Sequence, residues 1–367
     1  MKIRINTLVE IRDSILNANK QIIIYGAGMI GSVTTLSILE ELGIEKNIDF
    51  FCDGDPRKWG TSISDFPVYR KEKLKEISAQ KHVLLIAISR FYDVLEELDK
   101  YDNLHDIDCW IIPMICIECY RPSNVYFNVK QSHIQQIPKV IHYMWLGHEK
   151  MPPKLQKCID SWERFCPDYE IKKWDENNYN IEKISYMKQA YESNAYGFVP
   201  DYARLDILYN HGGIYLDTDV ELVRSLDDLL YQEAFCCVEK WQTINFGGGS
   251  GSRPQNELIG ALLKEREEIG FINSDGSLNK NTCGYYDTKF FMKNGYKING
   301  KLQRINGVTV YPYEVFHPYD YMSGKIEKTT NTYGIHHFNG GWLDESQLEA
   351  NILTVQCYDD LYKRAKR

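Results

Sequence analysis

The stretch of sequence that decides the fold is Asp201-Tyr-Ala-Arg204-Leu-Asp-Ile-Leu-Tyr-Asn-His-Gly212-Gly213-Ile-Tyr-Leu-Asp217-Thr-Asp219. Its first half places apolar side chains along one stripe, which predicts a helix packed against a sheet. The pair Gly212-Gly213 ends that helix, because glycine adopts left-handed backbone angles that other residues resist. Residues 214–216 then predict a short buried strand. The whole stretch predicts a helix, a tight turn and a strand that ends in two acids.

The two acids at the end of the predicted strand indicate a metal site. Side chains alternate along an extended strand, so we expect Asp217 and Asp219 to face the same way. Two converging carboxylates repel each other unless a cation lies between them, and oxygen ligands suit Mg²⁺ or Mn²⁺. Asp201 and Arg204 lie one turn apart on the preceding helix, which brings an acid and an arginine beside the pair. We therefore expect a site that holds a metal ion and a nucleotide diphosphate.

These residues, in this order, resemble the catalytic centre of the family 32 glycosyltransferases, which includes capsular-polysaccharide, mannosyl- and galactosyltransferases. That family is related to the large clostridial glucosylating toxins and combines an Asp-Arg helix with a metal-binding DXD strand. Other segments that match it in order are Ile137–Gly147, Ser161-Trp162, Trp174–Asn177 and His336–Trp342. The resemblance covers about residues 137–345. It implies a GT-A fold, a nucleotide-sugar donor and retention of the anomeric configuration.

The resemblance also implies how a metal ion would be held. Asp219, and Asp217 directly or through water, would hold Mn²⁺ or Mg²⁺ against both phosphates of the donor. His337 and Asn339 would complete the ligands, with His336 as the neighbour that bonds backbone instead. Adjacent residues of an extended chain face opposite ways, so only one of the two histidines is expected to bind the ion.

The resemblance also implies that four residues of this chain would contact the donor. Asp201 and Arg204 would bind the sugar hydroxyls, and Arg204 would also steady a phosphate oxygen. Trp145 matches the aromatic residue on which the donor base stacks, which favours a UDP-sugar. Trp342 would cover the diphosphate and exclude water. We expect a front-face reaction, in which the leaving phosphate helps to deprotonate the acceptor.

A second glycine-rich turn lies near the start of the chain. The apolar strand Gln21–Tyr25 leads into Gly26-Ala-Gly28-Met-Ile-Gly31, and Asp53 follows at the spacing expected for an acid that bonds a ribose hydroxyl. This segment resembles the nucleotide-binding-like domain of bacterial sugar-modifying enzymes. A turn of this kind also serves to pack a helix on a strand. Nucleotide binding at these positions and a structural or docking role both stay open.

The fold class is α/β, with two domains in a chain of 367 residues. Further apolar strands at residues 82–88 and 107–112 alternate with helices, which predicts a Rossmann-like parallel sheet over residues 1–115. Residues 116–136 lack a clear period and are predicted to be a linker. Residues 137–367 would form the GT-A glycosyltransferase domain, which ends in a C-terminal helix.

Composition and charge limit the partners and the cellular location that we expect for this protein. A net charge of −8 argues against nucleic acid, and no apolar run approaches the ~20 residues that span a bilayer. The first residues lack the apolar core of a signal peptide, so we expect a cytoplasmic protein. The basic end Lys363–Arg367 either touches an anionic membrane at its inner face or forms a solvated helix end.

Three functions are compatible with these observations. The first is a metal-dependent retaining glycosyltransferase that moves a sugar to a saccharide or lipid-linked saccharide in cell-surface or capsular polysaccharide synthesis. The second is an NAD(P)-dependent oxidoreductase or epimerase of sugar nucleotides, based on the first glycine-rich turn. The third is a non-catalytic carbohydrate-binding protein. The sequence favours the first, because a protein that only binds has no need for the full set of Asp201, Arg204, Asp217 and Asp219.

Overall fold

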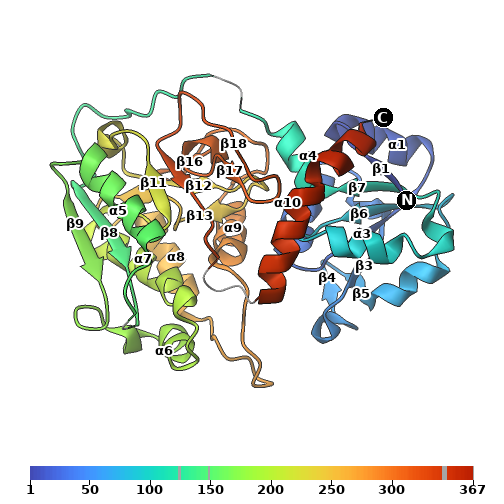
Figure 1. Ribbon diagram of the computed structural model, residues 1–367, viewed down its shortest axis with the longest axis horizontal. Helices are drawn as coiled ribbons and strands as arrows, with labels where there is room; N and C mark the ends of the chain where they lie inside the picture. Colours follow the sequence, from blue (N-terminus) through green and yellow to red (C-terminus); the bar gives the residue numbers. More distant parts are fainter. Residues whose placement is uncertain (123–124, 148, 341–344, 367) are drawn as a thin grey trace.

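The structure is a computed structural model that describes residues 1–122, 125–147, 149–340 and 345–366. Two sheets, each covered by helices, lie side by side, one built from the N-terminal residues and one from the middle and later part of the chain (Figure 1). The fold is mixed α/β, as the sequence predicts.

The first sheet is parallel except at one edge. Its strands follow the order β1 (Lys2–Arg4), β7 (Asp108–Ile111), β6 (His82–Ile86), β2 (Gln21–Tyr25), β3 (Ile48–Asp53), β5 (Phe66–Arg70) and β4 (Ser62–Ile63). The helices of this part are α1 (Leu8–Asn17), α2 (Leu36–Leu42), α3 (Tyr92–Leu98) and α4 (Ile112–Cys119). The central strands are buried on both faces, with Ile22, Ile23 and Ile24 fully inaccessible. Apolar runs of this kind are typical of parallel strands, and the predicted parallel sheet is confirmed.

The second sheet is mixed and positions the candidate site. Its order is β15 (Gln303–Ile305), β16 (Val308–Tyr311), β12 (Ala234–Val238), β14 (Ser250–Ser252), β10 (Gly213–Tyr215), β8 (Val140–Met144) and β9 (Glu170–Trp174), with β13 (Ile244–Asn245) paired to β12. Its helices are α5 (Pro153–Phe165), α6 (Ser185–Glu192), α7 (Pro200–His211), α8 (Glu257–Glu267) and α9 (Cys283–Lys293). Two small antiparallel pairs complete this part, β11 (Val220–Leu222) with β19 (Gly334–His336), and β17 (Tyr319–Asp320) with β18 (Lys325–Ile326).

The segment expected to be a linker is held by hydrogen bonds at both ends. Its first residues complete helix α4, and Tyr120 donates its hydroxyl to the carbonyl of Ile298 at 3.3 Å. Further on, the amide of Gln131 donates to the carbonyl of Tyr231 at 3.0 Å. The side chain of Gln131 also donates to Thr309 Oγ1 at 2.6 Å. This connection, which the sequence predicts to be a linker, therefore makes hydrogen bonds to residues of the second part.

The last helix, α10 (Glu345–Ala365), returns to the first part of the molecule. The sequence places this helix in the second domain, whereas in the structure it packs on α3 and β1. The carbonyl of Ala365 accepts the amide of Ile5 at 3.2 Å. Tyr362 donates its hydroxyl to Glu118 Oε2 at 2.7 Å, and Lys366 Nζ lies 2.9 Å from Glu118 Oε1. Figure 1 shows α10, in red, standing between the two parts.

The two parts share one continuous apolar core. A π-helical turn over Ile30–Thr35 precedes α2 at the boundary, where Thr34 donates its buried hydroxyl to the carbonyl of Trp241 at 3.0 Å. Met29 Sδ lies 3.7 Å from Thr282 Oγ1, just before α9. The first part is thus docked directly on the second.

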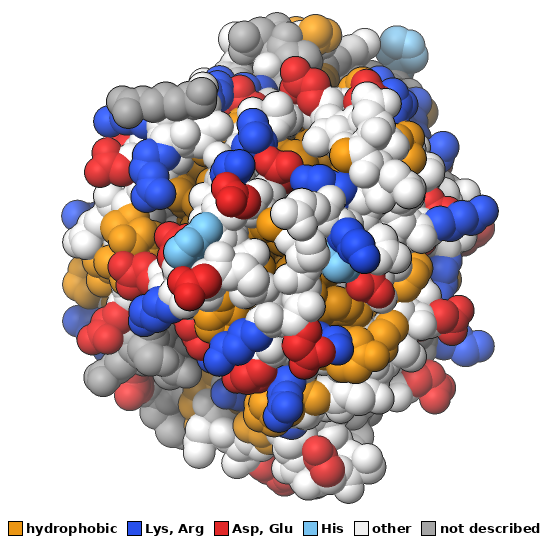
Figure 2. Space-filling model, turned by 90° about the vertical axis from the view of Figure 1, so that its right-hand side faces the viewer, with side chains coloured by type: hydrophobic (Ala, Val, Ile, Leu, Met, Phe, Trp, Pro, Cys, Tyr) orange, Lys and Arg blue, Asp and Glu red, His pale blue; other side chains and the backbone are white. Residues whose placement is uncertain are grey.

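The surface of the N-terminal part is mixed in charge. Figure 2 shows this side of the molecule, with acidic and basic side chains interspersed over it. Among the described residues, no helix has the length and hydropathy that crossing a lipid bilayer requires.

Candidate functional site

The two acids of the DXD sequence lie in a turn beyond the strand that leads to them. Strand β10 ends at Tyr215, one residue earlier than the sequence predicts. The amide of Asp217 donates to the carbonyl of Gly247 at 2.8 Å, and the amide of Val220 donates to the carbonyl of Asp217 at 3.1 Å. The alternation rule used to place Asp217 and Asp219 on one face therefore does not apply, and the turn sets their positions instead.

Arg204 joins the helix to the first acid. Its Nη2 lies 3.2 Å from Asp217 Oδ1 and 3.5 Å from Asp201 Oδ1, and its Nη1 contacts Cys283 Sγ at 3.4 Å. The side chains of Arg204 and Asp201 are almost completely buried. Burial opposes the charge of the guanidinium, but Asp217, Cys283 and Asp201 outweigh it and raise the pKa of Arg204. The structure brings together the three residues that the sequence assigns to donor binding and metal binding, and it fixes Arg204 between two carboxylates.

Asp219 is held from the opposite side by the C-terminal histidine segment. Its Oδ1 lies 3.2 Å from His336 Nε2, and its Oδ2 accepts the amide of Asn339 at 2.7 Å. Burial alone would raise the pKa of Asp219, but the His336 ring and these hydrogen bonds overcome it and lower the pKa. The pairing of β11 with β19 sets this contact, because it aligns Val220 with His336. Asp219 is therefore a fixed anion.

The ring that faces Asp219 is that of His336, whereas the sequence assigns this position to His337. The ring of His337 faces Glu221, with Nε2 2.9 Å from Oε2, while its amide donates to the carbonyl of Asp219 at 3.0 Å. His336 is the residue whose ring faces Asp219. Adjacent side chains point in opposite directions, as expected, but the register of β19 selects the first one. Asn339 contributes its amide, and its side chain is exposed; Trp342 lies outside the described residues.

The chemistry of the donor set suits a hard divalent ion. Asp217 and Asp219 offer carboxylate oxygens, and the negative charges of Asp219 and Asp217 raise the pKa of His336 against the lowering effect of its burial. Among the described residues, no group of three or more His, Cys, Asp or Glu side chains is arranged to hold a metal ion. Mg²⁺ is commonly bound by one or two carboxylates together with substrate phosphates and water. The residues present fit an ion of this kind that is shared with the substrate.

Three consecutive glycines separate the two halves of the site. A Cβ atom on Gly247 would lie 2.1 Å from Asp217 Oδ2 and 2.6 Å from Arg204 Nη1. A Cβ atom on Gly248 would lie 2.0 Å from His317 Nε2. The amides of both glycines donate to Asn245 Oδ1, at 2.7 and 2.8 Å. The structure shows a buried segment that packs against Asp217, Arg204 and His317.

Trp145 follows β8 at the edge of the sheet that carries the acids. Strands β8 and β10 are parallel, so their carboxyl ends meet at the same edge, where ligands bind in open α/β sheets. The amide of Trp145 donates to the carbonyl of Trp174 at 3.0 Å, and the indole Nε1 of Trp145 donates to the carbonyl of Glu149 at 3.0 Å. The ring is half-buried. This position is compatible with base stacking, which stays a prediction.

The glycine-rich turn of the first part is tight and already supported by protein groups. A Cβ on Gly31 would lie 1.8 Å from the carbonyl oxygen of Gly26, whose φ is +112°, whereas one on Gly28 would meet only Lys58 Nζ, at 3.9 Å. Asp53 Oδ2 accepts the amide of Ala27 at 2.7 Å and lies 2.9 Å from Lys58 Nζ. Asp53 therefore holds the turn in this structure, and Met29 of the same turn docks on the second part.

Several residues near the site have no signature in the sequence. They come from separate elements and include Asn245, Arg266, Cys283, Asp287 and His317. Cys283, the first residue of α9, contacts Arg204. No spacing rule predicts such residues, because they come together only when helices such as α8 pack on α7 and on α9.

The chain resembles glycosyltransferases over the part that holds the Asp-Arg helix and the DXD turn. Residues 152–236 match the family described as "Glycosyltransferase sugar-binding region containing DXD motif". This family implies the use of a divalent metal ion, without specifying which one. Asp201, Arg204, Asp217 and Asp219 lie within the match, while Trp145 and the C-terminal histidines lie outside it.

Curated relatives carry glycosyltransferase names. "Uncharacterized glycosyltransferase L373" of Acanthamoeba polyphaga mimivirus is 28% identical over 158 residues, which is 38% of this chain and 62% of that protein. "Inositol phosphoceramide mannosyltransferase 3" of Schizosaccharomyces pombe is 39% identical over 124 residues, 31% of this chain and 33% of that protein. The chain thus spans less than two thirds of either relative. Among solved structures, "PaToxG Glycosyltransferase" gives a TM-score of 0.34 at 17% identity, covering 50% of this chain and 76% of that chain. A TM-score at this level does not define a fold, so the GT-A arrangement stays a prediction.

Proposed function

We propose that this chain is a metal-dependent, retaining glycosyltransferase of GT-A type that transfers a hexose from a nucleoside diphosphate sugar. The observation that carries the proposal is the buried bridge from Asp201 through Arg204 to Asp217, at the sheet edge where Asp219 is also fixed. A buried arginine between two carboxylates is costly unless it is fully paired. A binding role for the sugar and diphosphate of a donor explains why such a costly arrangement is kept beside the DXD turn.

The residues of the site would divide the work in the following way. Asp201 would accept hydroxyls of the donor sugar, and Arg204 would donate to the sugar and to a phosphate oxygen with its planar guanidinium. Asp217 and Asp219 would hold Mn²⁺ or Mg²⁺. When bound, such an ion neutralises charge that grows on the leaving diphosphate. His336 would keep Asp219 anionic and oriented, because its ring contacts the carboxylate directly.

The substrates are also part of this proposal. The position of Trp145 supports a uridine base, and the names of the yeast relatives favour mannose as the first hexose to test. A saccharide or lipid-linked saccharide of a cell-surface or capsular polysaccharide is the proposed acceptor, and the proposed location is the cytoplasm. Retention would follow from a front-face reaction, in which the leaving phosphate takes the proton of the acceptor hydroxyl.

A donor screen tests the proposal. Purified protein is incubated with UDP- and GDP-sugars, with and without Mn²⁺, and release of the nucleoside diphosphate is measured together with any new glycoside. We expect release from one donor that depends on the metal and falls at least about 100-fold in Asp219→Asn. Retention of NAD(P) with no release from any sugar nucleotide would replace the proposal by the oxidoreductase alternative.

A further inference from the structure

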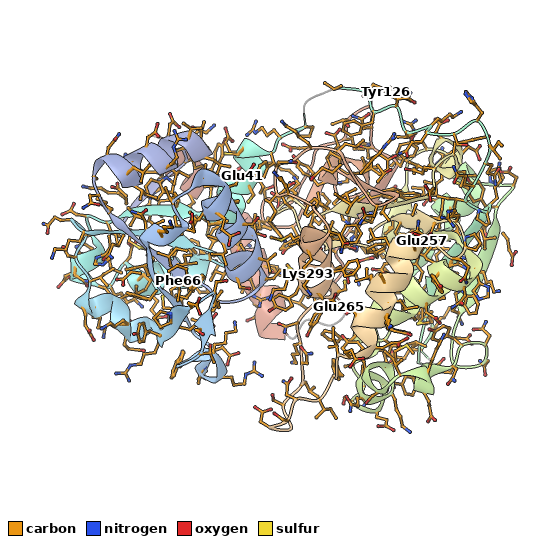
Figure 3. All side chains as sticks on the ribbon, turned by 180° about the vertical axis from the view of Figure 1, so that it is seen from behind. Glu41, Phe66, Tyr126, Glu257, Glu265 and Lys293 are labelled. Atoms are coloured by element: carbon orange, nitrogen blue, oxygen red, sulfur yellow. The ribbon has the colours of Figure 1, made fainter. Side chains whose placement is uncertain are left out.

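A second pair of buried charges lies behind the helix that carries Asp201 and Arg204. Arg266 comes from α8 and Asp287 from α9, and their side chains are only 3% and 1% exposed. Helix α8 packs on both α7 and α9. Figure 3 shows α8 and α9 from behind, where Lys293 Nζ and Glu265 Oε1 join the two helices at 2.8 Å. The pair is therefore fixed by packed helices.

The geometry of this pair is poor for a purely structural salt bridge. Arg266 Nε lies 3.8 Å from Asp287 Oδ1, which is too long for a hydrogen bond. Both Nη atoms of Arg266 and both carboxylate oxygens of Asp287 lack a hydrogen-bonding partner among the described residues. Arginine and carboxylate usually form two parallel hydrogen bonds when they stabilise a fold. Apolar residues of similar size often replace a buried ion pair without loss of stability, so stability alone does not explain why these charges are here.

Tyr186 contacts both Asp201 and the guanidinium of Arg266. The Oδ1 atom of Asp201 faces Arg204, and its Oδ2 accepts the hydroxyl of Tyr186 at 3.4 Å. The guanidinium of Arg266 lies 5.9 Å from the centre of the Tyr186 ring and 4.7 Å from that of Tyr286. Arg266 therefore lies beside the tyrosine that bonds Oδ2 of Asp201, whereas Arg204 faces Oδ1.

Electrostatics link the same residues. Burial raises the pKa of Asp201, and the positive charges of Arg204 and Arg266 both act against that rise. In return, Asp287 and Asp201 raise the pKa of Arg266, which burial alone would lower. Acidic and basic side chains thus alternate in space in the order Asp217, Arg204, Asp201, Arg266 and Asp287.

We propose that Arg266, backed by Asp287, is a positioning residue of the donor-sugar site that acts through Asp201. Arg266 supports the carboxylate from the Tyr186 side, so that Oδ1 stays directed at Arg204 and the group stays able to accept a sugar hydroxyl. Asp287 is the acid that lies next to the guanidinium, at 3.8 Å. This inference rests on the proposed role of Asp201 in binding the sugar of the donor. It adds a layer of residues that the match over residues 152–236 does not include.

The test separates binding of the sugar from binding of the nucleotide. Arg266→Met and Arg266→Lys are compared with Lys264→Met, which changes an exposed position of the same helix. KM for the nucleotide sugar is measured by product release, and the Kd of the bare nucleoside diphosphate is measured by calorimetry. We expect Arg266→Met to raise KM on the order of tenfold, as for loss of a buried charge-assisted contact. The Kd should change less than about twofold, and Arg266→Lys should recover part of the loss. Equal effects on KM and Kd, or no effect in a folded variant, would overturn the inference.

A second measurement does not depend on turnover. The midpoints of thermal unfolding are compared for Arg266→Met, Asp201→Asn and the double variant. Residues in contact through one network give non-additive effects, so we expect the double variant to shift the midpoint by less than the two single shifts together. Additive shifts would overturn the link between Arg266 and Asp201. A wild-type protein that binds no nucleotide sugar would instead overturn the proposed function.

Discussion

Arg204→Lys is the most informative single substitution in the site. Lysine keeps the positive charge but replaces a planar fork by one ammonium group, which cannot serve two carboxylates in the same geometry. Arg204 spans Asp217 at 3.2 Å and Asp201 at 3.5 Å, so we expect the variant to lose one of these two contacts. A charge-assisted hydrogen bond contributes about 1.5–3 kcal/mol. Because the arginine is buried, little of that is lost to screening, and kcat/KM should fall about 10- to 150-fold.

The assay is release of nucleoside diphosphate from the preferred sugar donor under Mn²⁺, with kcat and KM determined separately. Circular dichroism and the unfolding midpoint establish that the variant is folded. If Arg204 serves sugar and phosphate in both the bound and the reacting state, KM rises and kcat also falls. A folded variant with kcat/KM within about twofold of the wild type would show that Arg204 is a structural cation and would remove it from the donor site.

The remaining predictions concern the glycine segment, the domain contact and a buried acid. Gly247→Ala should reduce nucleotide release more than about tenfold, because its Cβ would lie 2.1 Å from a carboxylate oxygen of Asp217; Gly54→Ala, at an exposed turn, should leave release unchanged. Thr34→Val removes a buried 3.0 Å hydrogen bond between the two parts and should lower the free energy of unfolding in urea by about 1–3 kcal/mol; no change would show that this contact is dispensable. Burial raises the pKa of Asp287 to about 7, against the opposing charge of the neighbouring arginine on α8. The protonated acid is favoured in the folded state, so its contribution to stability is present below pH 4 and is lost as the pH rises to about 7, by up to roughly 4 kcal/mol. Asp287→Asn should lack this loss, and a stability difference from wild type that is constant from pH 5 to 8 would contradict the assignment.

The sequence predicted those parts of the fold that local pattern determines. Long apolar runs such as Gln21–Tyr25 and His82–Ile86 identified the parallel sheet, and Gly212-Gly213 marked the end of α7. Strand β1 was missed, because three residues with two basic side chains have no apolar run. The position of α10 was missed as well, since amphipathic spacing does not say which part of a molecule a helix covers.

The candidate site was predictable where neighbours in sequence are neighbours in space. Asp201, Arg204 and Asp217 lie on consecutive elements, and the structure brings them into contact. The choice between His336 and His337 depends on the register of β19 against β11, and a shift of one residue exchanges the two faces. Residues that come from α8 and α9 need the tertiary arrangement before they can be named.

The return of α10 to the first sheet has a consequence for biosynthesis. Domains of a nascent chain commonly fold in the order in which they emerge. Here the helix that covers α3 and β1 emerges only after the whole second sheet has been made. Until then the first part lacks one of its packing partners. The packing of α3 and β1 is therefore complete only after residues 345–365 have been made. Of the two parts, the one that is synthesised earlier thereby completes its packing later.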